Sequence, residues 1–201
     1  MLRTAEETVR WVVGEFGESA CLLASMQDAV LIDVALNVEP SLEVVFLDTG
    51  YHFEETWETL RAVEQRYETT VKVIAHDQPR PAEPIAPGAC CDDKADLLDQ
   101  ALDGRAAWLS GIRRSETATR AHVSIIDIDR RDLIKVSPLA QWNDDDVQRH
   151  IDARNVTVNP LIAQGYPSIG CATCTIRPHD PTDTRSGRWA DQDKTECGLH
   201  L

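Results

Sequence analysis

Short apolar runs alternate with amphipathic segments through the first third of the chain, and this alternation limits the possible folds more than any other feature. The clearest run is LEVVFL at residues 42–47, which stops at a polar turn. A strand–helix–strand alternation is typical of a parallel sheet with helices on both faces, so the sequence predicts an α/β fold. The predicted strands are residues 20–24, 42–47 and 71–74, and the predicted helices are residues 5–16, 29–36 and 53–67.

The remaining two thirds carry weaker signals of the same kind. Four prolines between Pro79 and Pro87 predict a loop, and Asn143 followed by three aspartates predicts a capped helix. Because 42% of the 201 residues are hydrophobic, we expect a single domain, residues 1–201, with the tail 178–201 packed on it. Further elements are predicted at residues 92–102 (helix), 106–109 (strand) and 122–127 (strand).

The formal net charge of −14 bears on the class of partner. An acidic protein repels nucleic acid at long range, so we expect no nucleic-acid partner. An anionic small molecule would need a local group of cations. The chain offers one such group in Arg113, Arg114 and Arg120, and a second in Arg177, Arg185, Arg188 and Lys194.

The sequence also bears on location. No apolar run reaches the length of a membrane span, and the first residues lack the basic-then-apolar layout of a signal peptide. We therefore expect a cytoplasmic protein with no membrane partner. Six cysteines in such a protein indicate metal binding or catalysis rather than disulfides. The oligomeric state stays open, a homo-oligomer included.

Two polar turns follow predicted strands. Ser25-Met26-Gln27-Asp28 comes after the strand 20–24, and Asp48-Thr49-Gly50 comes after the strand 42–47. Ligands of parallel sheets bind beyond the carboxyl ends of the strands. The two turns are therefore candidates for two walls of one nucleotide pocket, although many α/β proteins carry a polar turn at such a place.

Four cysteines form two pairs, Cys90-Cys91 and Cys171-x-x-Cys174. Their spacing lets four thiolates reach one metal centre, which fits zinc or an iron–sulfur cluster. A redox dithiol and incidental buried cysteines are the alternatives. Cys21 stands in an apolar run and is interpreted as a small buried hydrophobe.

Cys197 stands apart from both pairs, in a polar tail with Lys194 and His200. Nearby cations lower the pKa of a thiol, whereas the neighbouring Glu196 acts in the opposite direction. Cys197 is therefore a candidate nucleophile, and the alternative is an exposed tail cysteine without a role.

Seven motifs in a fixed order resemble one family, the assimilatory sulfonucleotide reductases, and within it the adenylyl-sulfate reductases that carry an iron–sulfur cluster. The resemblance runs from about residue 25 to residue 201. The motifs are SMQDAVL from Ser25, LDTGYHF from Leu47, the double cysteine at Cys90, SGIRR from Ser110, GYPSIGCATC from Gly165, RSGRW from Arg185 and ECGLH from Glu196.

The resemblance implies an adenine nucleotide α-hydrolase-like fold and reduction of adenosine 5′-phosphosulfate to sulfite and AMP. It implies that Cys197 attacks the sulfur atom, that a cysteine S-sulfonate forms, and that thioredoxin then releases sulfite. It also implies one 4Fe–4S cluster per chain, bound by Cys90, Cys91, Cys171 and Cys174. The substrate-binding residues implied are Ser25, Asp48, Thr49, Gly50, Lys94, Arg113, Arg114, Arg120, Arg185, Arg188 and His200.

The sequence departs from the family pattern near the double cysteine. The family usually has two residues and then Arg-Lys there, whereas here Asp92-Asp93-Lys94 follows. Lys94 matches the family lysine, the arginine is missing, and the two aspartates change the local charge. The chain stops after the ECGLH motif with no thioredoxin-like extension, so we expect a separate donor protein. We also expect the tail to close over bound nucleotide.

Three other functions compete with this prediction. The first is reduction of 3′-phosphoadenylyl sulfate, alone or alongside adenylyl sulfate, although relatives with that preference generally lack both cysteine pairs. The second is an ATP-pyrophosphatase-type synthetase, whose phosphate loop needs glycines that Ser25-Met26-Gln27-Asp28 lacks. The third is a non-catalytic zinc-binding module.

Overall fold

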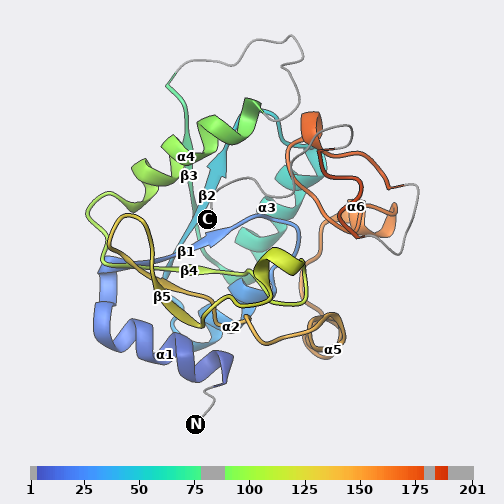
Figure 1. Ribbon diagram of the computed structural model, residues 1–201. Helices are drawn as coiled ribbons and strands as arrows, with labels where there is room; N and C mark the ends of the chain where they lie inside the picture. Colours follow the sequence, from blue (N-terminus) through green and yellow to red (C-terminus); the bar gives the residue numbers. More distant parts are fainter. Residues whose placement is uncertain (1–3, 78–88, 179–183, 190–201) are drawn as a thin grey trace.

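The computed structural model describes residues 4–77, 89–178 and 184–189, and its centre is one six-stranded sheet (Figure 1). The strand order is β3-β2-β1-β4-β6-β5, and every neighbouring pair is parallel except β5 with β6. The mostly parallel sheet is therefore confirmed. The strands are β1 (Ala20–Ala24), β2 (Glu43–Asp48), β3 (Val71–Ala75), β4 (Ala107–Ser110), β5 (Ile126–Ile128) and β6 (Ile134–Val136).

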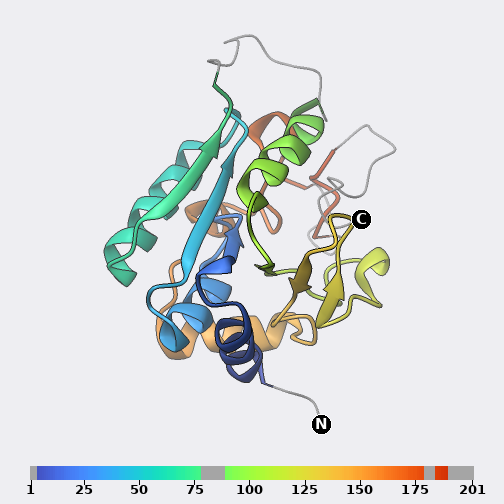
Figure 2. The ribbon, with the colours of Figure 1, turned by 90° about the vertical axis from the view of Figure 1, so that its left-hand side faces the viewer.

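Helices cover both faces of the sheet, as predicted, with α4 on the opposite side from α1 and α3 (Figure 2). Three short 3₁₀ turns lie at Gly17–Ser19, Ala118–Arg120 and Ala172–Cys174. The helices are α1 (Ala5–Phe16), α2 (Val30–Val38), α3 (Glu54–Tyr67), α4 (Ala89–Leu102), α5 (Asp144–Arg154) and α6 (Pro160–Ala163).

The central strands are apolar throughout because each of their faces packs against helices. Leu22 and Phe46 belong to the core shared with α1, α2 and α3. Cys21 and Trp108 belong to the core under α4. Cys21 is fully buried, and burial raises the pKa of its thiol to about 11, so its interpretation as a small buried hydrophobe is confirmed.

Two helices begin with a reciprocal pair of side-chain hydrogen bonds, and the cap predicted at Asn143 is one of them. The Thr4 side chain accepts from the backbone of Glu7, and the Glu7 carboxylate accepts from the backbone of Thr4. Asn143 forms the same reciprocal box with Asp146 at the start of α5. Because these bonds satisfy backbone N–H groups that a helix start leaves unpaired, they fix where α1 and α5 begin.

The prediction of a strand over residues 122–127 is wrong in its bounds. The strand is only β5, Ile126–Ile128, and the residues before it form turns. Val123 donates its N–H to the carbonyl of Arg120, and the Arg114 side chain donates to the carbonyl of Val123, so this backbone is bonded outside the sheet. The partner strand β6 was not predicted, since three residues are too few to show a period.

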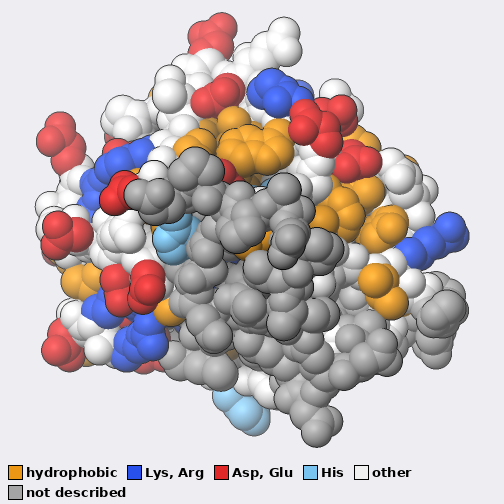
Figure 3. All heavy atoms as spheres, turned by 90° about the horizontal axis from the view of Figure 1, so that it is seen from above, with side chains coloured by type: hydrophobic (Ala, Val, Ile, Leu, Met, Phe, Trp, Pro, Cys, Tyr) orange, Lys and Arg blue, Asp and Glu red, His pale blue; other side chains and the backbone are white. Residues whose placement is uncertain are grey.

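Residues 155–178 lie against the turns that follow the strands. Asn159 donates its backbone N–H to the carbonyl of Gln27, and Ala172 donates to the carbonyl of Tyr51. The loop predicted between Pro79 and Pro87 falls outside the described residues. No helix in the described ranges is long and apolar enough to cross a membrane. Seen from above, acidic and basic side chains are interspersed around the described surface (Figure 3).

Candidate active site

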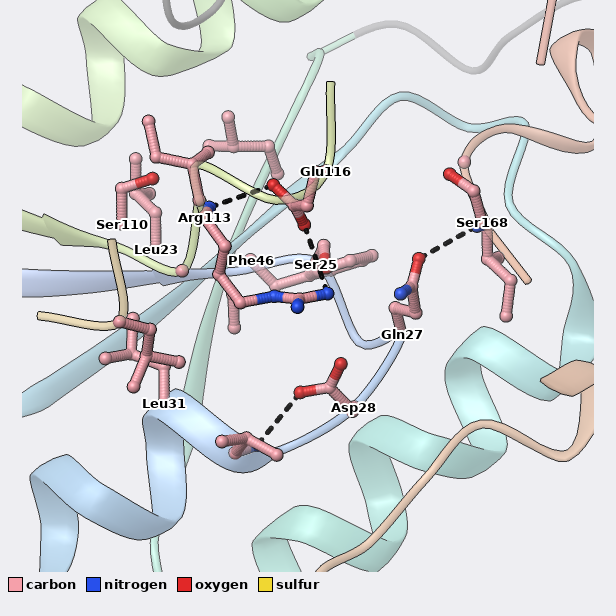
Figure 4. A pocket seen from close by; sticks show the side chains of 18 of the residues that line it. Leu23, Ser25, Gln27, Asp28, Leu31, Phe46, Ser110, Arg113, Glu116 and Ser168 are labelled. Atoms are coloured by element: carbon pink, nitrogen blue, oxygen red, sulfur yellow. Dashed lines mark hydrogen bonds and ion pairs between the residues drawn. The ribbon is translucent and has the colours of Figure 1, made fainter. Parts of the chain in front are cut away.

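A pocket lies at the carboxyl ends of β1 and β4, where the strand order reverses direction. From β1 the chain moves outward through β2 and β3, and then returns to place β4 on the other side of β1. The loops after β1 and β4 therefore diverge and leave a crevice between them, which is where open α/β sheets bind ligands. The first loop contributes Ser25 to the pocket lining, and the second contributes Arg113 (Figure 4).

The loop after β1 is held in place by the C-terminal part of the chain. Met26 is buried in a left-handed conformation, with φ of 59°, and its carbonyl accepts from the side chain of Asn159 at 3.1 Å. The side-chain oxygen of Gln27 accepts from the N–H of Ile169 at 3.0 Å (Figure 4). These bonds leave the Ser25 side chain exposed toward the pocket.

Asp28 closes the bottom of the pocket, where its carboxylate accepts from the N–H of Val30 at 3.0 Å. Burial raises the pKa of Asp28, although that hydrogen bond and the charge of Arg113 act in the opposite direction. Asp28 thus brings a carboxylate into a pocket that otherwise carries mostly cations.

The turn after β2 lies beside the pocket rather than on its lining. Asp48 accepts from the N–H of Gly50 at 2.7 Å, which closes the turn, and Gly50 has the positive φ of 76° that glycine tolerates. Thr49 is fully buried. Their chain neighbours Leu47 and His52 do line the pocket. The two predicted walls are therefore adjacent, but the second wall presents Leu47 and His52 to the pocket rather than the predicted turn 48–50.

Five cations line the pocket, and all of them were singled out by the sequence. Arg114 is not among them, because its side chain turns away to donate to the carbonyl of Val123 at 2.8 Å. Arg185 and Arg188 donate to the hydroxyl of Ser168 at 3.4 and 3.3 Å. The five are Lys94, Arg113, Arg120, Arg185 and Arg188.

Two of the four predicted metal ligands lie together near the pocket. Cys171 precedes a 3₁₀ turn and Cys174 ends it, each is 5% exposed, and both pack with Trp189. The hydroxyl of Thr49 lies 3.1 Å from the sulfur of Cys171. A dry site with a hydroxyl at the sulfur suits thiolate ligands, which need both exclusion of water and hydrogen-bond support.

The other two predicted ligands, Cys90 and Cys91, lie in the first turn of α4, which begins three residues earlier than predicted. A helix start favours thiolates because its unpaired N–H groups carry partial positive charge. The side chains of both cysteines fall outside the described residues. Lys94, one turn further along α4, lines the pocket, so α4 begins close to it. Four thiols from these two segments suit an iron–sulfur cluster or zinc.

Cys197 and His200 lie outside the described residues, as does Lys194, so their predicted roles stay predictions. Gln27 and Asp28 belong to the turn that the sequence marked as a pocket wall, and both line the pocket. Glu116, His52 and Ser168 also line it and were not predicted as site residues, although His52 and Ser168 belong to motifs that the sequence had marked. The signal for Glu116 was its spacing, three residues after Arg113 and four before Arg120.

Comparison with known proteins gives a consistent result. Residues 20–177 match the model of the phosphoadenosine phosphosulfate reductase domain. The chain is 46% identical to a protein named adenosine 5′-phosphosulfate reductase from Mycolicibacterium smegmatis, over 98% of this chain and 89% of that protein. Proteins of the same name from Streptomyces coelicolor and Mycobacterium tuberculosis are 42% and 41% identical, over 98% of this chain and 88% and 89% of theirs.

Solved structures share the fold at low sequence identity. The crystal structure of phosphoadenylyl-sulfate reductase from Candida auris matches with a TM-score of 0.73 and 23% identity, over 87% of this chain and 91% of that one. An FMN adenylyltransferase from Candida glabrata matches with a TM-score of 0.63 and 18% identity, over 87% and 64%. Both likenesses support the α/β fold predicted from the sequence.

Proposed function

Because the chain belongs to the phosphoadenosine phosphosulfate reductase family, we propose that it reduces adenosine 5′-phosphosulfate to sulfite and AMP. The observation that carries the proposal is the convergence of five cations on a pocket at the switch point of the sheet, next to a buried pair of cysteines. Relatives at 41–46% identity carry the name adenosine 5′-phosphosulfate reductase.

The pocket would hold the nucleotide with its phosphosulfate toward the arginines. Ser25, at the end of β1, lines the pocket where the nucleoside would lie, and the turn Asp48-Thr49-Gly50 after β2 stands beside it. The planar guanidinium groups of arginine pair well with phosphate and sulfate oxygens. Arg185 and Arg188 also lie over the ring of Trp189, at 5.5 and 4.5 Å from its centroid, which stiffens them.

The reaction would start at Cys197. Its thiolate attacks the sulfur of the substrate, a sulfur–sulfur bond forms, and the sulfur–oxygen bond to AMP breaks with the electron pair leaving on the phosphate oxygen. The cations of the pocket stabilise that developing charge. A thiolate of thioredoxin then attacks Cys197, sulfite leaves with the bonding electron pair, and the second thioredoxin thiol resolves the mixed disulfide. A cytoplasmic location suits this need for a reduced dithiol.

Cys90, Cys91, Cys171 and Cys174 would hold a 4Fe–4S cluster, consistent with the burial of the second pair. When bound, such a cluster would tie α4 to the segment 171–174 and add its electrostatic field beside the phosphosulfate. The same four cysteines favour adenylyl sulfate over its 3′-phosphorylated form.

The test is sulfite formation from adenosine 5′-phosphosulfate with reduced thioredoxin, using protein purified without air. Cys197→Ser should abolish sulfite formation, while the protein keeps about four iron and about four acid-labile sulfide ions per chain. Cys21→Ala removes a thiol from the core and should keep the activity. Sulfite formation by Cys197→Ser would overturn the mechanism, and faster turnover of the 3′-phosphorylated substrate would overturn the assigned specificity.

A further inference from the structure

A carboxylate occupies the cationic side of the pocket. Glu116 lies on the loop after β4, and Figure 4 shows its carboxylate directed toward Arg113. One carboxylate oxygen accepts from Arg120 Nη1 at 2.5 Å and from the backbone N–H of Arg113 at 3.0 Å. The other lies 3.8 Å from Arg113 Nη2. Two of the five cations that line the pocket are therefore paired with an internal anion.

These pairs are largely shielded from water. The side chains of Arg113, Arg120 and Glu116 are 14%, 10% and 21% exposed. Charge-assisted hydrogen bonds strengthen as water is excluded, so the carboxylate competes effectively for the guanidinium donors. A phosphate or sulfate group can use those donors fully only if Glu116 releases them.

We propose that Glu116 is a displaceable counter-anion, a positioning residue that holds Arg113 and Arg120 in the empty pocket and lowers its affinity for anionic ligands. The identity of the ligand as a nucleotide rests on the proposed function, whereas the competition between anions does not. For a reductase that releases AMP, such a residue keeps the product from binding too tightly.

A purely structural role would predict a different outcome. If Glu116 only supported the loop, its removal would loosen the two arginines and weaken anion binding. If it competes with the ligand, its removal takes a carboxylate away from two shielded cations, and an external anion replaces it. The sign of the change in affinity therefore separates the two roles.

Asp144 provides a matched control. Its carboxylate also pairs with Arg113, at 2.6 Å, but it is 74% exposed and lies outside the pocket lining. Asp144→Asn removes the same charge from the same arginine on the solvent side. Exposed ion pairs contribute little, so this change should move anion affinity by no more than about twofold.

The experiment is calorimetric titration of AMP, and separately of inorganic sulfate, into the wild type, Glu116→Gln and Asp144→Asn at several salt concentrations. Glu116→Gln should lower the Kd for both anions by about tenfold, equal to about 1.4 kcal/mol. Its log Kd should also rise more steeply with log salt, because one more net cation is engaged. Glu116→Asp keeps the charge and should shift the Kd less than Glu116→Gln does.

Unchanged or weaker binding of both anions by Glu116→Gln would overturn the proposal, provided that its thermal unfolding matches the wild type. If Glu116→Gln binds the anions more tightly but the wild type forms no sulfite, this inference is upheld and the proposed function is rejected. If the wild type forms sulfite but Glu116→Gln gains no anion affinity, the proposed function is upheld and this inference is rejected.

Discussion

His52 is a buried imidazole at the edge of the pocket, with 5% of its side chain exposed. Its Nε2 atom lies 3.1 Å from the carbonyl of Leu47. Burial, followed by the charge of Lys94, lowers the pKa of His52 to about 4, so the ring is neutral near pH 7. The folded pKa lies below the unfolded value near 6.5, so the neutral ring contributes stability above pH 6.5 that is lost as the pH falls toward 4.

Replacing His52 with Gln should therefore flatten the acid limb of the stability curve. The difference in unfolding free energy between wild type and His52→Gln should shrink by up to about 3 kcal/mol from pH 7 to pH 4. Urea titrations at five pH values measure it. A difference that does not change with pH would show that the folded protein accommodates the charged ring.

At the residue scale, the sequence predicted which kinds of side chain meet but not where each one points. Arg113 and Arg114 are neighbours in one motif, yet only Arg113 enters the pocket. The backbone of the loop decides this, because Arg114 satisfies the carbonyl of Val123 instead. Side-chain direction in a loop depends on distant partners, which no local pattern encodes.

At the element scale, the segment 184–189 folds back against residues 174–176, and this contact positions Arg185 and Arg188. Ile176 donates its N–H to the carbonyl of Gly187 at 2.8 Å, and Trp189 donates to the carbonyl of Cys174 at 2.9 Å. A Cβ atom on Gly187 would overlap the carbonyl oxygen of Ile176. The segment that carries Arg188 can therefore lie against residues 174–176 only with glycine at this position.

Gly187→Ala should separate this segment from the pocket and leave the sheet intact. The expected result is at least about a tenfold rise in the Kd for AMP with little change in global unfolding, because a 1 Å shift of a binding group can cost that much. Gly14→Ala is the control, since Gly14 lies in the last turn of α1 and its Cβ would meet nothing within 4 Å. It should add about 0.5–1 kcal/mol of stability and leave AMP binding unchanged. Equal AMP affinity in both variants would contradict the prediction.

Prediction of the elements succeeded where a segment was long or carried a cap. The helices α1 and α3 and the strands β1 to β4 lie within one or two residues of their expected bounds, and α5 begins directly after its predicted cap. The elements β6 and α6 have three and four residues, so neither shows a full period, and tertiary contacts define them. The start of α4 came earlier than predicted because the two cysteines themselves are helical.

At the scale of the whole molecule, alternation predicted a parallel sheet but not its strand order. The pocket depends on that order, since it lies where β4 returns beside β1. The choice is made by long-range packing: Trp108 of β4 joins the core under α4, and its ring nitrogen donates to Asp129 at 2.9 Å. Neither contact can be read from sequence spacing.

A buried carboxylate joins three helices on the face of the sheet opposite α4. Asp33 of α2 is 2% exposed and accepts from the hydroxyl of Tyr67 in α3 at 3.1 Å. It also accepts from Arg154 in α5 and lies 2.9 Å from Nε2 of His150 in the same helix. Burial opposes ionisation, but the hydrogen bonds from Arg154 and His150 prevail and hold the pKa of Asp33 below its usual range.

Asp33→Asn should therefore destabilise the fold by about 2 kcal/mol at pH 7, the usual scale for losing hydrogen bonds to a charged group. Arg154 is 43% exposed, so water can solvate it once its partner is neutral, which limits the loss. Since the pKa is lowered by folding, the stabilisation is present above about pH 4 and is lost as the pH falls through the folded value.

Denaturant titrations of the wild type, Asp33→Asn and Asp152→Asn at pH 7 and pH 3 measure this difference. Asp152 is exposed on α5 and hydrogen-bonds Gln148, so its change should stay within about 0.5 kcal/mol. The loss in Asp33→Asn should be smaller at pH 3 than at pH 7, because below about pH 4 the unfolded wild type binds a proton at Asp33, which removes part of the stabilisation. An equal loss at both pH values would mean that packing, rather than charge, joins the three helices.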